Sequence, residues 1–106
     1  IIDNYKLKNI TVIIDRNNSD FRSIKFLNLK KKLSVFCDKI VEVDGHNVLK
    51  LDKVIYQSLK HKKNFYIIIA NTIKGKGIKS IENNPAWHHK APSKKELGLF
   101  KKELKI

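Results

Sequence analysis

Two short segments carry residue types that could bind or protonate an anionic ligand. The first, Lys74-Gly75-Lys76-Gly77, places two ammonium groups among glycines that let the backbone approach a ligand closely. Its spacing matches neither the phosphate-binding Gly-x-x-x-x-Gly-Lys-Ser/Thr loop nor the dinucleotide fingerprint, which needs a third glycine. On spacing alone, the segment is as consistent with a basic turn as with a phosphate-binding loop.

The second segment, Trp87-His88-His89-Lys90, combines two imidazoles with a cation. Histidines that are neighbours in sequence seldom chelate one ion, and no cysteine or acidic pair lies nearby at zinc spacing. A lysine beside a histidine favours its neutral form, which suits a proton carrier. We interpret this segment as a basic, histidine-bearing loop that could bind a phosphorylated or anionic ligand.

Asn17 is a third candidate, because it follows a short apolar run that ends at Ile14. A neutral amide oxygen there could ligate a hard cation such as Mg²⁺, together with backbone carbonyls. The alternative is an Asx turn, in which Asn17 or Asn18 bonds its own backbone. Spacing alone favours the turn.

The elements that would position these residues begin with three β-branched apolar runs, at 10–14, 40–43 and 65–70. Continuous runs of this kind are typical of strands buried on both faces of a parallel sheet. They predict strands near 10–15, 39–44 and 65–71.

Three helices are predicted around these strands. One follows Asn47 as its N-cap, with Val48, Leu51, Ile55 and Leu59 on one apolar face. Residues 27–36 can form a second helix, with Leu29, Leu33 and Phe36 on one side. A Ser93–Glu96 capping box starts a terminal helix over 93–104, whose apolar stripe is Leu97, Phe100 and Leu104. Residues 71–92 have little periodicity and predict an extended functional loop.

This order of elements predicts an α/β fold: a partial doubly wound parallel sheet of about three strands with flanking helices. Ligands of such sheets bind beyond the carboxyl ends of the strands. The rule places 15–17, 44–46 and 71–76 on one rim. A three-stranded parallel sheet has exposed edges, so we expect it to be half of a larger sheet whose other part lies upstream.

Composition adds a strong positive charge, since 23 Lys and Arg against 10 Asp and Glu give +13. This charge alone favours a nucleic-acid partner. Nearly all of these residues are Lys, however, and Lys, Ile and Asn share A/T-rich codons; no nucleic-acid-binding motif is present. A basic nucleic-acid-binding module is therefore a disfavoured alternative. The single cysteine and the lack of a membrane-length apolar run predict a cytoplasmic chain without membrane partners.

The segment 71–92, NTIKGKGIKSIENNPAWHHKAP, closely resembles the transketolase loop that reads T-x-K-G-x-G, then E-N, then W-H-x-K-A-P. Two further segments agree in order. KLKNITVIIDRN, at 6–17, is similar to the strand that closes the family's thiamine-diphosphate motif, and IVEVDGHN, at 40–47, is similar to its next strand and turn. Residues 1–106 thus resemble the carboxyl-terminal part of the transketolase diphosphate-binding domain, especially that of separate amino-terminal subunits.

The resemblance implies roles for five residues. Asn17 would ligate Mg²⁺ through its side chain, and Ser19 would ligate it through its backbone carbonyl. Lys74 would contact thiamine diphosphate. His88 would lie near the diphosphate and the reacting carbon, assisting substrate binding and proton transfer, and Lys90 would be an accessory charge for the substrate.

The resemblance further implies transfer of a two-carbon ketol unit between phosphosugars, as in the pentose phosphate pathway, with thiamine diphosphate and Mg²⁺. The partners implied are an upstream half-domain and a pyrimidine-binding domain or subunit, in a homodimeric or heterotetrameric assembly. The family's Gly-Asp-Gly would lie before Ile1, so this segment alone is expected to be inactive. Related alternatives are 1-deoxyxylulose-5-phosphate synthase and a 2-oxo-acid dehydrogenase component, which share Lys-Gly-x-Gly but not the ENNPAWHHKAP sequence.

The chain departs from the family at three positions of these motifs. Asn18 and Ser19 stand where the family has glycine and then Leu or Ile, and His89 stands where it usually has glycine. Asn is the mildest replacement for a glycine with positive φ, because asparagine also visits that region.

Overall fold

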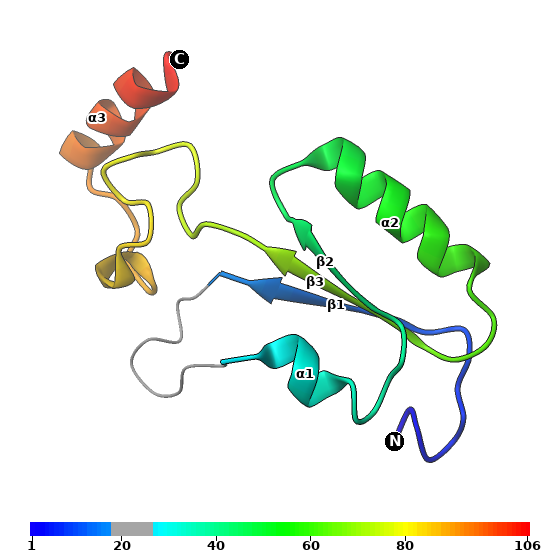
Figure 1. Ribbon diagram of the computed structural model, residues 1–106. Helices are drawn as coiled ribbons and strands as arrows, with labels where there is room; N and C mark the ends of the chain where they lie inside the picture. Colours follow the sequence, from blue (N-terminus) through cyan, green and yellow to red (C-terminus); the bar gives the residue numbers. More distant parts are fainter. Residues whose placement is uncertain (18–26) are drawn as a thin grey trace. The chain divides into compact units, whose positions relative to one another are not determined.

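The computed structural model describes residues 1–17 and 27–106 (Figure 1). Along the chain these residues form β1 (Thr11–Arg16), α1 (Leu29–Leu33), β2 (Ile40–Asp44), α2 (Val48–Lys60), β3 (Tyr66–Asn71), a 3₁₀ helix η1 (Pro85–Trp87) and α3 (Lys94–Leu104). The described residues fall into two compact units. The first unit comprises residues 1–16 and 27–72, and the second comprises Asn17 and residues 73–106.

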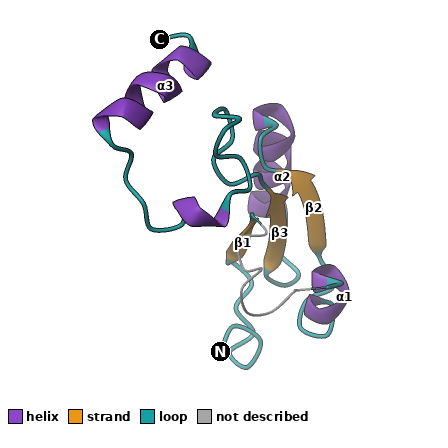
Figure 2. Cartoon of the chain, turned by 90° about the vertical axis from the view of Figure 1, so that its left-hand side faces the viewer, coloured by secondary structure: helices purple, strands orange, loops and turns teal. Residues whose placement is uncertain are grey.

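The three strands of the first unit form one parallel sheet in the order β1–β3–β2. Thr11 to Arg16 pair with Tyr66 to Asn71, and Ile40 to Asp44 pair with Ile67 to Asn71. Figure 2 shows the strands side by side, with β3 in the centre. The observed architecture confirms the predicted α/β fold class.

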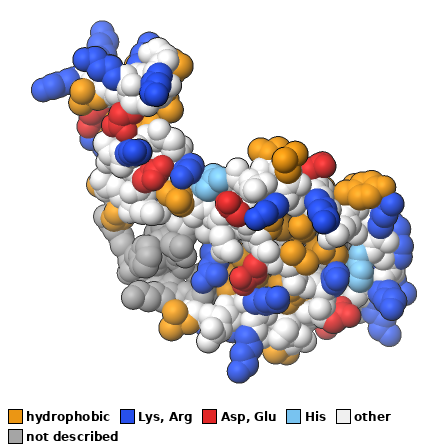
Figure 3. All heavy atoms as spheres, turned by 45° about the horizontal axis from the view of Figure 1, so that its top comes forward, with side chains coloured by type: hydrophobic (Ala, Val, Ile, Leu, Met, Phe, Trp, Pro, Cys, Tyr) orange, Lys and Arg blue, Asp and Glu red, His pale blue; other side chains and the backbone are white. Residues whose placement is uncertain are grey.

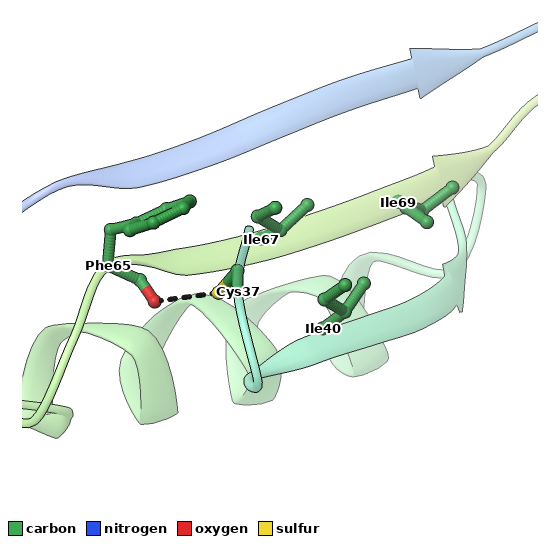
Figure 4. Packing of buried hydrophobic residues seen from close by; sticks show 5 residues of the cluster. All are labelled: Cys37, Ile40, Phe65, Ile67 and Ile69. Atoms are coloured by element: carbon green, nitrogen blue, oxygen red, sulfur yellow. Dashed lines mark hydrogen bonds between the residues drawn. The ribbon is translucent and has the colours of Figure 1, made fainter. Parts of the chain in front are cut away.

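One face of the sheet packs against α1. Its core consists of Cys37, Ile40, Phe65, Ile67 and Ile69, of which Ile69 is completely buried (Figure 4). The alternation of 65, 67 and 69 follows from the two-residue period of a strand. Leu29 and Leu33 of α1 pack against this cluster, and the Cys37 thiol donates a hydrogen bond to the Phe65 carbonyl at 3.1 Å. Burial raises the pKa of Cys37, so this thiol is a core residue rather than a nucleophile.

The opposite face packs against α2, which lies on the other side of the sheet from α1 in Figure 1. Tyr66, Ile68 and Ala70 alternate with the residues of the first core and contact Val43 and Val54. All of β3 except its last residue is buried. Its position as the central strand, covered on both faces, explains why its sequence is a continuous apolar run.

The buried face of α2 differs from the predicted one. Leu51 packs toward the sheet as expected, but Val54 and Ser58 are the buried residues, while Val48 and Leu59 are 75% and 65% exposed. The buried Ser58 hydroxyl has two hydrogen-bond partners, one in its own helix and one in the sheet. It donates to the Ile55 carbonyl at 2.7 Å and lies 3.0 Å from Thr11 Oγ1 of β1. These hydrogen bonds offset the cost of burying a polar serine.

The helix at 27–36 is shorter than predicted and covers only Leu29–Leu33. Asn28 has a left-handed backbone conformation, with φ of 54°, which prevents the helix from extending toward its amino end. Phe36 lies beyond the carboxyl end of α1 and is 59% exposed, in contrast to its predicted place on the apolar side.

The second unit contains residues 73–92 of the predicted loop, together with α3. The Ser93–Glu96 capping box is present as predicted, with both reciprocal hydrogen bonds, and Phe100 is the buried residue of α3. None of the helices in the described part of the chain is long and apolar enough to cross a membrane.

Candidate functional site

The carboxyl ends of the three strands are joined by hydrogen bonds at one rim of the first unit. Gly45 after β2 donates its amide to the Asn71 carbonyl at 2.8 Å, and Thr72 after β3 donates its amide to the Arg16 carbonyl at 3.1 Å. The Thr72 hydroxyl also donates to the Asp15 carboxylate of β1. Sequence reasoning placed these strand ends on one rim, and the pairing confirms it for the described residues 15–16, 44–46 and 71–72.

The turn after β2 has little freedom. A Cβ at Gly45 would overlap the Thr72 methyl group and lie 3.1 Å from the Asn71 carbonyl oxygen, so only glycine fits this approach. The Asp44 carboxylate accepts the His46 amide at 2.9 Å in an Asx turn. Asn47 then caps α2 by accepting the Lys50 amide at 3.0 Å, as predicted. The exposed His46 is therefore carried on a fixed turn.

The loop of the second unit begins with a tight turn at Lys74-Gly75. Gly75 has a φ of +75°, and a Cβ there would lie 2.9 Å from the Ile81 carbonyl oxygen. The Asn83 amide donates to the Lys74 carbonyl at 2.9 Å. Lys74 is half-buried, and these contacts hold its backbone in place.

Glu82 balances part of the basic charge of this loop. Its carboxylate accepts the Gly77 amide at 3.1 Å and lies 3.8 Å from the Lys76 ammonium nitrogen. Gly77 has a φ of +103°, a conformation that favours glycine. Lys76 is thus paired with Glu82 within the loop.

The histidine segment follows the short helix η1. Asn84 caps this helix by accepting the Ala86 amide at 3.0 Å. The imidazole rings of His88 and His89 meet edge to face, with centroids 4.2 Å apart, and both residues are exposed. Lys90 lies over the Trp87 ring, its nitrogen 4.3 Å from the centroid. Two imidazoles and a cation are thus gathered on one short stretch.

The five predicted site residues are placed as follows. Asn17 directly follows β1 and is half-buried, while Ser19 lies outside the described residues. Lys74, His88 and Lys90 belong, with Asn17, to the second unit. Lys74 lies at the start of the loop, where its carbonyl accepts the Asn83 amide. Lys90 lies near the end of the loop, over the Trp87 ring.

Sequence reasoning missed the partner of Lys90. Its ammonium nitrogen donates to Glu96 Oε1 at 2.5 Å. The two residues are six apart, with Lys90 before the helix and Glu96 within it. The helical spacings i, i+3 and i, i+4 that predict ion pairs therefore do not apply. The Ser93–Glu96 capping motif could have indicated this partner, because it fixes the Glu96 carboxylate beside the residues just before α3.

A Mg²⁺ site would be only partly supplied by these residues. Mg²⁺ prefers an octahedral shell of oxygen ligands, to which Asn17 offers a side-chain amide oxygen. The described residues contain no group of three or more His, Cys, Asp or Glu that could hold a metal ion. One amide oxygen would therefore supply only part of the shell of a Mg²⁺ ion. The cationic Lys74 fits an anionic group such as a diphosphate, whereas the amides of Lys76, Gly77 and Ile78 donate to acceptors within the protein.

A second basic feature lies in the first unit. A pocket of about 620 Å³ on the α1 side is lined by Arg16, Lys30 and Lys31 together with Asn28, Leu29, Ser34 and Glu42. Among these described lining residues, none was predicted as a site residue. Three cations against one carboxylate make the pocket electropositive, but it carries no motif that indicates a ligand.

Comparison with known proteins identifies relatives along most of the chain, although no protein-family model matches it. It is 34% identical over 106 aligned residues to a subunit of the apulose-4-phosphate transketolase of Actinobacillus succinogenes, covering 95% of this chain and 38% of that protein. It is also 38% identical to the transketolase of Mus musculus and 36% identical to that of Homo sapiens, each over 91 residues, covering 81% of this chain and 14% of the relative. The chain thus spans well under half the length of these relatives. It belongs to the transketolase family, as a segment of transketolase sequence.

Proposed function

We propose that residues 1–106 form the carboxyl-terminal part of a thiamine-diphosphate-binding domain that takes part in ketol transfer between phosphosugars. The observation that carries the proposal is the similarity to transketolases over most of the chain, together with the Lys74 to Lys90 loop. The place of Asn17 in the chain, directly after β1 of a parallel sheet, supports it, because ligands of such sheets bind beyond the carboxyl ends of the strands.

In this proposal, Asn17 and the Ser19 carbonyl ligate Mg²⁺, and Lys74 binds the cofactor's diphosphate. Thiamine diphosphate, when bound, supplies the nucleophile and electron sink for transfer of the two-carbon unit. His88 holds the substrate and moves a proton near the reacting carbon, and its exposed ring is accessible for that role. Lys90 adds positive charge for the phosphorylated substrate.

The partners proposed are an upstream half-domain and a pyrimidine-binding domain or subunit, in a homodimer or heterotetramer. Two relatives are named as single subunits of an apulose-4-phosphate transketolase, which supports assembly from separate chains. The segment alone is expected to be inactive, because a single amide side chain leaves the Mg²⁺ shell incomplete. We place the assembly in the cytoplasm.

The proposal is tested in two assays. The 106-residue chain, titrated with thiamine diphosphate and Mg²⁺ by calorimetry, should show no micromolar binding. The longest in-frame polypeptide that contains these residues, produced with its pyrimidine-binding partner, should transfer a ketol unit from xylulose 5-phosphate to ribose 5-phosphate. His88→Ala should lower kcat/KM by about 10²- to 10⁴-fold, the contribution typical of a general acid–base. The exposed Lys62→Ala serves as the control with unchanged activity.

Two outcomes would contradict the proposal. Transfer that proceeds without thiamine diphosphate would remove the cofactor assignment. Activity only with pyruvate as donor would favour a 1-deoxyxylulose-5-phosphate synthase or a 2-oxo-acid dehydrogenase component instead.

A further inference from the structure

The segment that carries His88 and His89 is held at both ends by one face of α3. On its amino side, the Trp87 ring packs edge to face on Phe100, with centroids 5.1 Å apart, and Phe100 is only 7% exposed. On its carboxyl side, Lys90 donates to Glu96 at 2.5 Å. Glu96 and Phe100 are four residues apart on α3, so their side chains lie one above the other.

Glu96 is itself held in a defined position. Its second oxygen, Oε2, accepts the Ser93 amide at 2.8 Å and the Ser93 hydroxyl at 2.7 Å. The hydrogen bonds from Lys90 and then from Ser93 lower the pKa of Glu96 to about 2, so the carboxylate is charged at neutral pH. One oxygen therefore serves the helix cap, and the other serves Lys90.

The two anchors are also linked to each other. The Lys90 nitrogen that pairs with Glu96 lies 4.3 Å from the centroid of the Trp87 ring, a cation–π geometry. Three contacts thus link Phe100 to Trp87, Trp87 to Lys90, and Lys90 to Glu96. We term these four residues the α3 clamp. His88 and His89 are the two residues between its anchors, and the centroids of their rings are 4.2 Å apart.

We propose that Glu96 is a positioning residue for the histidine pair, acting through Lys90. Without its charge, the carboxyl-side anchor is lost, while the ring contact between Trp87 and Phe100 remains. This inference rests on the proposed function in one respect, the role of His88 in catalysis. The orientation of the two imidazoles is a property of the protein without any ligand.

The variant Glu96→Gln tests the clamp in the 106-residue chain. Glutamine keeps an acceptor for Ser93 but loses the charge that holds Lys90. Trp87 is the single tryptophan, so its fluorescence reports on the clamp directly. We expect acrylamide quenching of Trp87 to rise by about twofold as the cation leaves the ring. The nuclear Overhauser effects between the His88 and His89 rings should weaken, while the circular dichroism of the chain stays unchanged.

Glu103→Gln is the matched control. Glu103 lies on the same helix, and its carboxylate accepts the amide of Ser80, which is not a residue of the clamp, at 3.2 Å. Glu103→Gln removes one negative charge, as Glu96→Gln does, and should leave the histidine and tryptophan signals unchanged. Lys90→Arg should preserve the signals, because arginine keeps both the ion pair and the cation–π contact. Lys90→Met should reproduce the effect of Glu96→Gln, and Lys94→Met should not.

The proposal fails if the histidine ring signals in Glu96→Gln equal those of the wild type, or if Glu103→Gln moves them equally. These measurements need neither cofactor nor turnover, so failure of ketol transfer would leave them unaffected. In an active assembly, Glu96→Gln should lower kcat by about three- to tenfold with KM changed less than about twofold, because orientation is lost rather than binding.

Discussion

At the scale of single residues, glycine marks the points where the backbone approaches a neighbour most closely. Gly45 and Gly75 each leave less room for a Cβ than a side chain needs, against Thr72 and against Ile81. Gly98 of α3 is different, because a Cβ there meets nothing within 4 Å. The same substitution should therefore have opposite signs at these positions.

Gly45→Ala should lower the free energy of unfolding by roughly 1–3 kcal/mol, the usual cost of overpacking. Gly98→Ala should raise it by roughly 0.5–1 kcal/mol, because alanine loses less backbone entropy in a helix than glycine. Urea denaturation followed by circular dichroism measures both. Equal effects of the two variants would show that the contact with Thr72 does not limit residue 45.

At the scale of elements, α3 depends on the ionised form of Glu96. The carboxyl group has a pKa of about 2 in the folded protein, below its ordinary value of 4.5. A depressed folded pKa means that the stabilisation is fully present above pH 4.5 and is lost as the pH falls through about 2. Ser93 and Lys90 both lose their charged acceptor over that range.

Amide hydrogen exchange in the first turn of α3 should therefore accelerate as the pH is lowered from about 5 to about 2, after correction for the intrinsic exchange rate. Glu96→Gln removes the titrating group and should abolish this pH dependence. Glu103 also has a lowered pKa, chiefly through its hydrogen bonds with Ser80. Glu103→Gln is thus the control that separates the two carboxylates, and an unaltered pH profile in Glu96→Gln would exclude Glu96 as the cause.

At the scale of the whole molecule, charge and exposed apolar surface dominate. The net charge is +13, and Figure 3 shows Lys and Arg side chains spread over the visible face rather than gathered in one stripe. Apolar side chains are also exposed: Ile13 of β1 to 55%, and Val48 and Leu59 of α2 to a greater degree. The dispersed positive charge favours non-specific attraction to polyanions over recognition of a particular one.

We expect the chain to bind an RNA of about 20 nucleotides and heparin alike, measured by fluorescence anisotropy, with affinity falling steeply between about 50 and 200 mM salt. The reason is release of counterions by scattered lysines. A clear preference for one nucleic acid that persists at the higher salt concentration would instead support the alternative of a nucleic-acid-binding module.

Sequence reasoning was reliable where the signal is local. The β-branched runs marked all three strands, and Ser93 with Glu96 marked the start of α3, because both patterns lie within a few residues. Prediction from the sequence failed where contacts between residues distant in sequence determine which side chains are buried or paired. The buried face of α2 depends on the hydrogen bond between Ser58 and Thr11, 47 residues away. The rim itself was predicted, but the hydrogen bond between Thr72 and Asp15 that links two of its strands was not. The ion pair of Lys90 with Glu96 could not be predicted either, because a lysine in a loop has no fixed spacing to a carboxylate in a helix.

The strand order β1–β3–β2 has a consequence for the timing of folding. The central strand is the last of the three to be synthesised, and β1 and β2 are bonded to it rather than to each other. At about 5–20 residues per second, the ribosome completes β1 several seconds before Tyr66 to Asn71 emerge. Until then, β1 and β2 lack the partner that they have among the described residues, and the pairing of Thr11 with Tyr66 must close a long loop. Among the described residues, β1 and β2 therefore wait for β3 to be inserted between them.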